Sequence, residues 1–223
     1  MRTKVIYFVR HGETVLNAQG IRQGAEGPLT ENGRVQALAT AKKFPTGKGK
    51  PQIMYASPFQ RTRETAEIIA KEIGIKEIHY LDLLRERKNP TEIVGHSKDE
   101  MVVRKIVDRI DKSFHDDDLR FSDEENFIDL RNRAKDLLHF ITHCKEQRIL
   151  MVTHSIFLGM VVSYMLRGDK LTASEYNKLS FLNPISNAGL TICTCTKRFL
   201  RKPVWKLLMW NDIVQPEDEQ NVL

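Results

Sequence analysis

The stretch that decides the fold lies near the start of the chain and reads Val5-Ile6-Tyr7-Phe8-Val9-Arg10-His11-Gly12-Glu13-Thr14. Its first five residues form an unbroken run of β-branched and aromatic side chains, which is typical of a strand buried on both faces. Reactive and charged residues follow this run, and open α/β sheets bind their ligands at the carboxyl ends of strands. The stretch therefore predicts that His11 is the chemical centre and that Arg10 holds an anion beside it.

The composition is that of a globular protein. The 223 residues are 41% hydrophobic and 29% charged, which is ordinary for a folded chain. This length allows one large domain or two small ones. No apolar run is long enough to span a bilayer, and the first run is too short for the core of a signal peptide. We therefore expect a cytoplasmic protein without a membrane partner.

The chain is basic, with a formal net charge of +6 and an isoelectric point of about 9.2. Such a charge would suit a nucleic-acid partner. However, the sequence contains no basic stripe interleaved with aromatic residues and no nucleic-acid-binding motif. The charge is better explained by chemistry on a small anionic substrate, and we expect no nucleic-acid partner.

The chain has three cysteines: Cys144, Cys193 and Cys195. A small, odd number of cysteines argues against a disulfide framework. Cys193 and Cys195 lie two residues apart, so they share one face of a strand. A single pair of this kind without a second ligand pair is weak evidence for a metal site. We expect two packed strand residues instead.

Apolar runs predict strands that alternate with helices, which is the pattern of an α/β fold with a mostly parallel sheet. The last two strands read as an antiparallel hairpin. The basic loop between them, 197–203, could attract anions or could simply protect the edge of the sheet. The expected strands cover 5–9, 53–56, 75–81, 149–153, 189–196 and 204–210.

Helix starts are predicted from side chains that can cap the first turn. Thr30 is expected to open a helix with an apolar face of Val35, Leu38, Ala39 and Phe44. Further starts are expected at Ser57-Pro58 and at the capping boxes Ser122-x-x-Glu125 and Thr172-x-x-Glu175. The helix after Ser122 is expected to bury Phe127, Leu130, Ala134, Leu137, Leu138 and Ile141.

The segment from about 87 to 126 differs from the rest, because loop-like residues surround one helix marked by Val103, Ile106, Ile110 and Phe114. We expect it to form a helical cap inserted over one end of the sheet. Asp116-Asp117-Asp118 in this segment could bind a metal, but a solvated turn is the commoner use of adjacent acids. The predicted fold class is a three-layer α/β/α sandwich: a mostly parallel mixed sheet with a C-terminal antiparallel hairpin and an inserted cap, in a single domain over 1–223.

Two histidines, His11 and His154, follow two of the buried strands. Neighbouring parallel strands would bring these ends together. Histidine is a common metal ligand, but Arg10 directly beside it would oppose a cation. A guanidinium group suits the paired oxygens of a phosphate, and Arg61 and Arg63 lie at the start of a helix, where anions are favoured. These residues predict a phosphate pocket with a histidine nucleophile.

Four blocks of sequence, in this order, resemble the histidine phosphatase superfamily, the phosphoglycerate mutase-like proteins with an Arg-His-Gly motif. The first is the stretch from Arg10 to Thr14 with Asn17. The second is Ser57-Pro58-Phe59-Gln60-Arg61 with Thr65-Ala66. The last two are Leu84-Arg85-Glu86-Arg87 and Val152-Thr153-His154-Ser155.

The resemblance implies a role for each matching residue. His11 would take the phosphoryl group as a phosphohistidine. Glu86 would be the general acid that protonates the leaving oxygen and then the base that activates water. The phosphate would be held by Arg10, Asn17, Arg61, His154 and Ser155. Neither a cofactor nor a metal is implied.

These roles make demands on the site. His11 must attack as neutral imidazole, and we expect a backbone carbonyl near Gly12 to fix its other ring nitrogen. The acid could also be another carboxylate, since Glu13 and Glu26 lie in the loop after the first strand. On the cap, the cationic groups either meet further negative charges of the substrate or are simply solvated; these are Arg85, Arg87, Lys88 and His96.

The chain departs from the family where Lys88-Asn89-Pro90 follows Arg87. Mutases of the family usually have His-Tyr-Gly there, so this difference weakens the interpretation of the chain as a glycolytic mutase. We expect a metal-independent phosphomonoester hydrolase acting on a small phosphorylated substrate. The alternatives are a cofactor-dependent phosphoglycerate mutase and a catalytically silent regulator that binds a phosphate ligand. The sequence leaves the physiological substrate and the oligomeric state open, and a homodimer is possible.

Overall fold

The structure, a computed structural model, describes residues 2–113, 117–182, 184–197 and 202–213. Its described strands form one sheet in the order β3-β2-β4-β1-β5-β6. Parallel pairing joins β1 to β4, β4 to β2 and β2 to β3, whereas β5 is antiparallel to both β1 and β6. The strands are β1 (Arg2–Arg10), β2 (Ile53–Ala56), β3 (Ile78–Tyr80), β4 (Arg148–Thr153), β5 (Leu190–Lys197) and β6 (Val204–Asp212).

This topology confirms the predicted α/β class, the mostly parallel sheet and the C-terminal antiparallel hairpin. One strand is shorter than predicted, because β3 is an edge strand that pairs with β2 through only Ile78 to Tyr80 rather than over 75–81. The basic loop between β5 and β6 falls mostly outside the described residues, as do Phe114 and Asp116.

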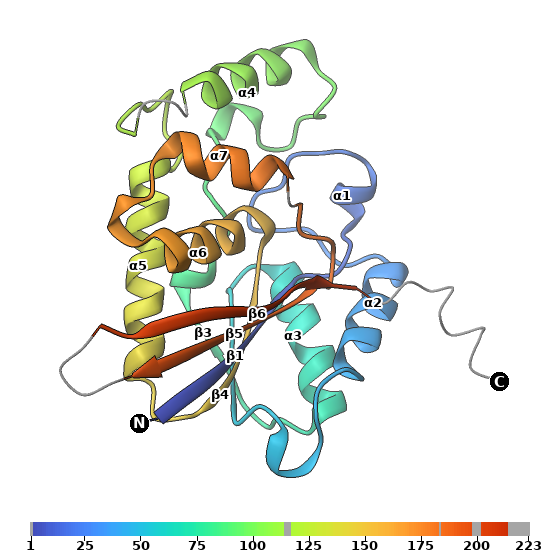
Figure 1. Cartoon of the computed structure of the whole chain (residues 1–223). Coiled ribbons are helices and arrows are strands. Elements are labelled where there is room, and N and C mark those ends of the chain that lie inside the picture. Colours follow the sequence, from blue (N-terminus) through green and yellow to red (C-terminus); the bar gives the residue numbers. More distant parts are fainter. Residues whose placement is uncertain (1, 114–116, 183, 198–201, 214–223) are drawn as a thin grey trace.

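Helices cover both faces of the sheet (Figure 1). One face carries α2 (Glu31–Ala41) and α3 (Gln60–Ile73), and the other carries α5 (Phe127–His143), α6 (Ser155–Arg167) and α7 (Ala173–Leu182). The short α1 (Val15–Ala18) follows β1, and α4 (Met101–Ser113) lies beyond α7, away from the sheet, at the top of Figure 1. Short 3₁₀ helices cover Gly47–Gly49, Asp82–Leu84, Thr91–Ile93 and Gly168–Lys170.

Strand β1 separates two cores. Ile6 and Phe8 pack into the core formed with α5, α6 and α7, while Tyr7 and Val9 pack into the core formed with α2 and α3. The prediction that the first strand is buried on both faces is therefore confirmed. The predicted face of α5 is also confirmed, since all six of its residues are buried: Phe127, Leu130, Ala134, Leu137, Leu138 and Ile141.

The predicted apolar face of α2 is wrong at two of its four residues, whereas Phe44, which follows the helix, is buried as expected and Ala39 is half-buried. Val35 and Leu38 are exposed, and the helix instead buries its small residues, Gly33, Ala37, Thr40 and Ala41. The reason is a close backbone approach: a Cβ atom at Gly33 would collide with the backbone of Glu13. Small side chains thus let α2 pack directly on the loop that follows β1.

Two of the expected helix starts are also wrong. α3 begins at Gln60, and its N-cap, Phe59, makes no side-chain hydrogen bond, so Ser57 is not the cap. α5 begins at Phe127, with a capping box of Asn126 and Asp129 rather than one based on Ser122. Ser57 and Glu125 are instead used for contacts described below.

Other start signals are confirmed. Thr30 caps α2 by accepting a hydrogen bond from the Gly33 N–H. Thr172 and Glu175 form the expected reciprocal bonds at the start of α7. Cys193 and Cys195 are buried residues of β5, and all three cysteines are free thiols. None of the helices in the described part of the chain is both long and apolar enough to cross a bilayer.

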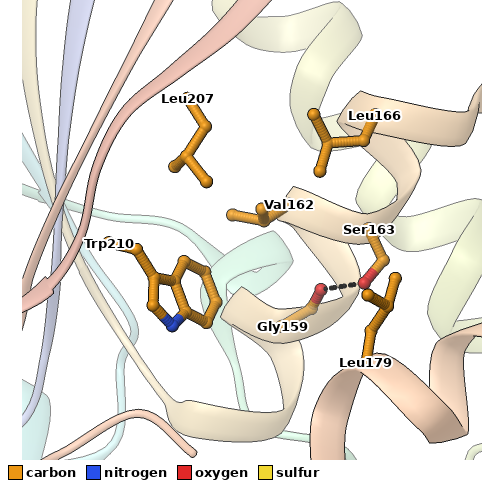
Figure 2. A pocket seen from close by; sticks show the side chains of 7 residues that line it. All are labelled: Gly159, Val162, Ser163, Leu166, Leu179, Leu207 and Trp210. Atoms are coloured by element: carbon orange, nitrogen blue, oxygen red, sulfur yellow. Dashed lines mark hydrogen bonds between the residues drawn. The ribbon is translucent and has the colours of Figure 1, made fainter. Parts of the chain in front are cut away.

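An apolar cavity of about 260 Å³ lies between α6, α7 and β6 (Figure 2). Its polar side chain is Ser163, whose hydroxyl donates to the Gly159 carbonyl at 2.7 Å. The remaining lining is aliphatic or aromatic: Val162, Leu166, Leu179, Leu207 and Trp210. Because the Ser163 hydroxyl already donates to a carbonyl and no lining residue could act as its base, this cavity is not a candidate active site.

Candidate active site

The two histidines meet at one edge of the sheet, as predicted. β1 and β4 are parallel neighbours in which Arg10 pairs with Thr153, so the next residue of each strand leaves the sheet at the same level. The ring centroids of His11 and His154 are 5.2 Å apart. Both side chains are buried, with 4% and 0% of their surface exposed.

His11 is held in one tautomer. Its Nδ1 lies 2.8 Å from the Gly12 carbonyl oxygen, and a carbonyl can only accept, so Nδ1 carries the proton and Nε2 keeps its lone pair. The expected bond from a backbone carbonyl near Gly12 is thus present. Burial first, and then the charges of Arg10 and Arg61, hold the pKa of His11 well below its usual range. The ring is therefore neutral at neutral pH, as a nucleophile must be.

His154 occupies the N-cap position of α6. Its Nδ1 accepts from Arg61 Nε at 3.3 Å, so Nε2 is the protonated nitrogen and donates to Ser57 Oγ at 2.9 Å. Burial and the Arg61 charge hold the pKa of His154 well below its usual range. Arg61, which can only donate, thus fixes the tautomer of His154, and Ser57 accepts the Nε2 proton. Sequence reasoning gave Ser57 to a helix cap and missed this role, although the residue stands in one of the family-like blocks.

Arg10 and Arg61 place two guanidinium groups beside the histidines. Arg61 is 3% exposed and donates from Nη1 to the Gly24 carbonyl at 2.8 Å. Burial lowers the pKa of Arg61 to about 10 and also lowers the pKa of Arg10. Arg10 donates from Nη1 to the Ile185 carbonyl, whereas its buried Nε has no hydrogen-bond partner among the described residues. Buried cations with an unused donor suit an anion.

Two other phosphate-binding candidates, Asn17 and Ser155, follow the strands that lead to the two histidines. Asn17 is on α1, and its buried Oδ1 has no hydrogen-bond partner within the described structure. Rotation of this amide by half a turn would present its NH₂ group, which can donate to a phosphate oxygen. Ser155 is the half-buried first residue of α6. Arg63, by contrast, stacks on the Tyr80 ring at 4.3 Å and donates to the Pro58 carbonyl, so it takes no part in the site.

Glu86 follows the 3₁₀ helix Asp82–Leu84 and reaches the start of α6. Its Oε1 accepts from the backbone N–H groups of Phe157 and Arg87, each at 2.9 Å, and Oε2 accepts from that of Ile156 at 3.2 Å. The carboxylate therefore completes the N-terminus of α6, where His154 provides no side-chain cap. Its charge also opposes the lowering of the Arg10 and Arg61 pKa values.

The competing carboxylates are used elsewhere. Glu13 Oε1 accepts from the Thr30 hydroxyl at 2.7 Å, at the start of α2. Glu26 is exposed. Of the three carboxylates that the sequence offered, Glu86 is thus the one whose charge reaches the buried arginines.

A cavity of about 410 Å³ opens beside Arg61 and Glu86. Three of the four cationic residues expected on the cap line it: Arg85, Arg87 and Lys88. The fourth, His96, does not; it is half exposed and pairs with Glu100 at 3.0 Å. Further lining residues are Gln23, Gly24, Ala25, Phe59, Asn89, Thr91, Val94, Glu125 and Arg133.

These residues can bind a phosphate group, attack it and move a proton. Within the described ranges no cluster of three or more His, Cys, Asp or Glu side chains could hold a metal ion. The fold and the site thus define an α/β enzyme of phosphate-ester chemistry. The model of the histidine phosphatase superfamily (branch 1) matches residues 6–212, so the chain belongs to this superfamily, and it is a phosphomonoesterase of the histidine phosphatase type.

Known proteins are similar over most of the chain. A metal-independent phosphoserine phosphatase of Arabidopsis thaliana is 30% identical over 217 residues, which cover 93% of this chain and 81% of the relative. A probable phosphoglycerate mutase GpmB of Photorhabdus laumondii is 33% identical over 72% of this chain and 74% of the relative. A solved phosphoserine phosphatase of Entamoeba histolytica in complex with phosphoserine has 28% identity and a TM-score of 0.70, covering 93% of this chain and 96% of that one.

Proposed function

We propose that this chain hydrolyses small phosphate monoesters through a phosphohistidine formed on His11. The observation that carries the proposal is the state of His11: a buried, neutral imidazole whose Nδ1 is tied to the Gly12 carbonyl, so that Nε2 is available for attack. The buried Arg61 and the half-buried Arg10 beside it can neutralise the charge of the transferred group, which phosphoryl transfer chiefly requires.

The first half-reaction forms one bond and breaks another. His11 Nε2 attacks phosphorus, and the bond from phosphorus to the ester oxygen breaks. Arg10 and Arg61 hold the phosphoryl oxygens, with His154 and Asn17 completing the phosphate site. Glu86 enters this step in its protonated form and gives its proton to the leaving oxygen, so the alcohol departs neutral.

The second half-reaction returns the enzyme to its starting state. The Glu86 carboxylate removes a proton from a water molecule, and that water attacks the phosphohistidine. The bond between phosphorus and Nε2 breaks, and inorganic phosphate leaves. Glu86 is again protonated and His11 is again neutral, so the cycle consumes one water per ester.

The substrate class follows from the cavity. We propose a small metabolite that carries charge besides its phosphate, because Arg85, Arg87 and Lys88 line the cavity together with Glu125. Phosphoserine, which the Entamoeba relative binds, has this character. The segment of about 87–126 would act as a cap over the site within a single domain.

A phosphoglycerate mutase is the second candidate, because several relatives carry that name, such as GpmB of Photorhabdus laumondii. It requires that the phosphohistidine return its phosphoryl group to a bound sugar acid rather than to water. Lys88-Asn89-Pro90 stands in the place of the His-Tyr-Gly of family mutases, which favours hydrolysis. We propose the cytoplasm as the compartment, which the three free thiols support.

The test combines a panel of phosphate esters with trapping of the intermediate. The panel contains phosphoserine, both phosphoglycerates and p-nitrophenyl phosphate, and it scores phosphate release and mutase turnover. We expect phosphate release, together with a phosphoenzyme that is labile in acid and stable in base. The His11→Ala variant should lose both. Wild-type turnover in that variant, or no trapped phosphoenzyme in the wild type, would refute the proposal, and mutase turnover in excess of hydrolysis would favour the second candidate.

A further inference from the structure

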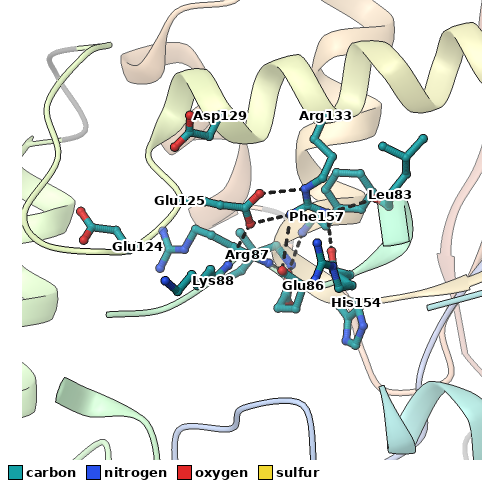
Figure 3. Close-up of polar contacts among 12 residues, drawn as sticks. Leu83, Glu86, Arg87, Lys88, Glu124, Glu125, Asp129, Arg133, His154 and Phe157 are labelled. Atoms are coloured by element: carbon teal, nitrogen blue, oxygen red, sulfur yellow. Dashed lines mark hydrogen bonds and ion pairs between the residues drawn. The ribbon is translucent and has the colours of Figure 1, made fainter. Parts of the chain in front are cut away.

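Arg133 of α5 contacts the segment that carries Glu86 (Figure 3). Its Nη1 donates to the carbonyls of Leu83 at 3.0 Å and Arg85 at 2.6 Å, and its Nη2 lies 3.4 Å from the carbonyl of Glu86 itself. A single guanidinium thus bridges three carbonyls of four consecutive residues. Its side chain is 12% exposed, so water competes little for these bonds.

Glu125 extends the same contact beyond Glu86. It accepts from Arg133 Nε at 2.8 Å and from Nη2 at 2.7 Å, which is the two-pronged geometry of a strong arginine–carboxylate pair. The Glu125 Oε2 also accepts from the Lys88 N–H at 2.9 Å, and the Glu125 N–H donates to the Lys88 carbonyl at 3.1 Å. The pair therefore holds the chain both before and after Glu86.

Phe157 links this pair to the Glu86 carboxylate. The Arg133 guanidinium lies 4.0 Å from the centroid of the Phe157 ring, and the backbone N–H of the same phenylalanine donates to Glu86 Oε1 at 2.9 Å. Arg133 of α5 thus holds the main chain of Glu86, and the N-terminus of α6 holds its carboxylate. Phe157 connects the two, because its ring contacts Arg133 and its N–H binds the carboxylate.

Glu86 needs such support because it lies in neither a helix nor a strand. Loop residues move more than residues in regular elements, yet a general acid must lie within hydrogen-bond reach of the atom it protonates. Accordingly, we propose that Arg133, with Glu125, is a positioning residue that holds Glu86 where its proton meets the leaving oxygen. This inference rests on the proposed function, in which Glu86 is the acid.

An arginine is required for this geometry. Its planar group offers five donors in a fixed fork, whereas a lysine has three donors around one point. Lysine at position 133 would keep the charge but could not serve the carboxylate and three carbonyls together. Arg133→Lys is therefore the informative variant, because it separates the geometry of the group from its charge.

A matched control is available on the same helix. Arg131 is also half-buried on α5, donates to a loop carbonyl, that of Leu171, at 3.2 Å, and lies 5.4 Å from the centroid of the Phe127 ring. It differs in that its bond goes to the loop before α7 and not to the segment of Glu86. Arg131→Lys thus reproduces the chemical change without affecting the proposed acid.

The experiment compares kcat/KM on two esters, p-nitrophenyl phosphate and phosphoserine. The nitrophenolate needs little protonation to leave, whereas the alkoxide of serine needs an acid. The value of kcat/KM covers the steps up to departure of the leaving group, so it reports on protonation of that group. The ratio of the two kcat/KM values does not depend on the fraction of active enzyme, so a loss of folded enzyme does not alter the ratio. Arg133→Lys should raise the ratio of nitrophenyl to seryl ester by about 10-fold or more, since misplacement of about 1 Å can cost about 100-fold.

The controls define the outcomes. Arg131→Lys should leave the ratio unchanged. Glu86→Gln should raise it most, and adding Arg133→Lys to Glu86→Gln should raise it no further, because both changes remove the same proton transfer. If Arg133→Lys does not fold, Glu125→Gln replaces it, since that change removes one prong of the pair, and it should shift the ratio in the same direction.

Equal losses on both esters in Arg133→Lys would show that the pair only stabilises the fold, and would overturn the inference. So would a further shift in the double variant, or an unchanged ratio in Glu86→Gln. These results leave the phosphoenzyme of the wild type in place. Failure to trap that phosphoenzyme would instead overturn the proposed function, so the two failures are distinguishable.

Discussion

Gly33→Ala should destabilise the protein although alanine is the better helix former. Gly33 lies in α2, where a Cβ atom would come within 2.8 Å of the Glu13 nitrogen and closer still to its carbonyl oxygen. Ordinary contacts of a Cβ atom begin at 3.4 Å, so the nitrogen alone requires the backbone of α2 or of the loop after β1 to shift by about 0.6 Å, and the closer carbonyl oxygen requires a larger shift. Both partners are main chain, so no side chain can rotate to relieve the clash.

The magnitude follows from two opposing effects. In an unhindered helix, replacing glycine with alanine stabilises by about 0.5–1 kcal/mol. Overpacking costs about 1–3 kcal/mol, and the main-chain clash places Gly33 near the upper end. We expect a net loss of about 1–2 kcal/mol in the free energy of unfolding.

The shift should also reduce activity. A Cβ atom at Gly12 would collide with the Gly33 carbonyl, so α2 also lies against the residue whose carbonyl holds His11. A displaced Gly12 carbonyl would turn the imidazole away from its position for attack. Since misplacement of about 1 Å can cost about 100-fold, we expect kcat for p-nitrophenyl phosphate to fall about 10-fold.

The assay is urea unfolding followed by circular dichroism, together with kcat on the same preparations. Gly159→Ala in α6 is the matched control, because the nearest atom to its Cβ would be the Tyr176 hydroxyl at an ordinary 3.8 Å. It should gain up to about 1 kcal/mol and keep its kcat. A Gly33→Ala protein as stable as the wild type would refute the close approach of α2, and unchanged kcat would refute its link to His11.

Two further predictions concern the histidines. The pKa values of His11 and His154 in the folded protein lie well below the ordinary 6.5. Below pH 6.5 the unfolded chain therefore binds more protons than the folded protein. The free energy of unfolding should be highest above pH 6.5 and should fall below it by up to about 1.4 kcal/mol per pH unit for each ring. A His154→Asn protein should show a correspondingly shallower dependence in urea unfolding between pH 6.5 and 5, and parallel curves would contradict the sign. Ser57→Ala leaves the buried His154 Nε2 proton without its acceptor and should cost about 1–3 kcal/mol; unchanged stability and kcat/KM would show that the bond is not needed.

The catalytic edge of the sheet could be predicted because its signal is local. An unbroken apolar run followed by a polar residue marks both His11 and His154, and parallel pairing then brings the two ends together. The α5 face was predictable for the same reason, since large apolar residues recur at helical spacing. In these places the local pattern and the tertiary fold require the same residues.

The sequence-based predictions were wrong or incomplete where tertiary contacts outweigh the local pattern of residues. α2 meets the Glu13 backbone through Gly33, where a Cβ atom would clash, and this contact leaves Val35 exposed. Serine is a common helix cap, but the Ser57 hydroxyl instead accepts a hydrogen bond from the buried His154. Arg133 gives no signal at all, because a charged residue on an amphipathic helix is usually solvated, and the carbonyls it binds lie about 50 residues away in the chain.

The central place of β1 has a consequence for local opening. Its amides and carbonyls bond to β4 on one side and β5 on the other, and this pairing runs up to the His11 N–H, which donates to Thr153 at 3.0 Å. Amides in such a position exchange with solvent only on global unfolding, whereas the Glu86 segment is held by side chains. Mild denaturant should therefore release the proton donor before the nucleophile, leaving a species that still cleaves activated esters after it has lost those of simple alcohols.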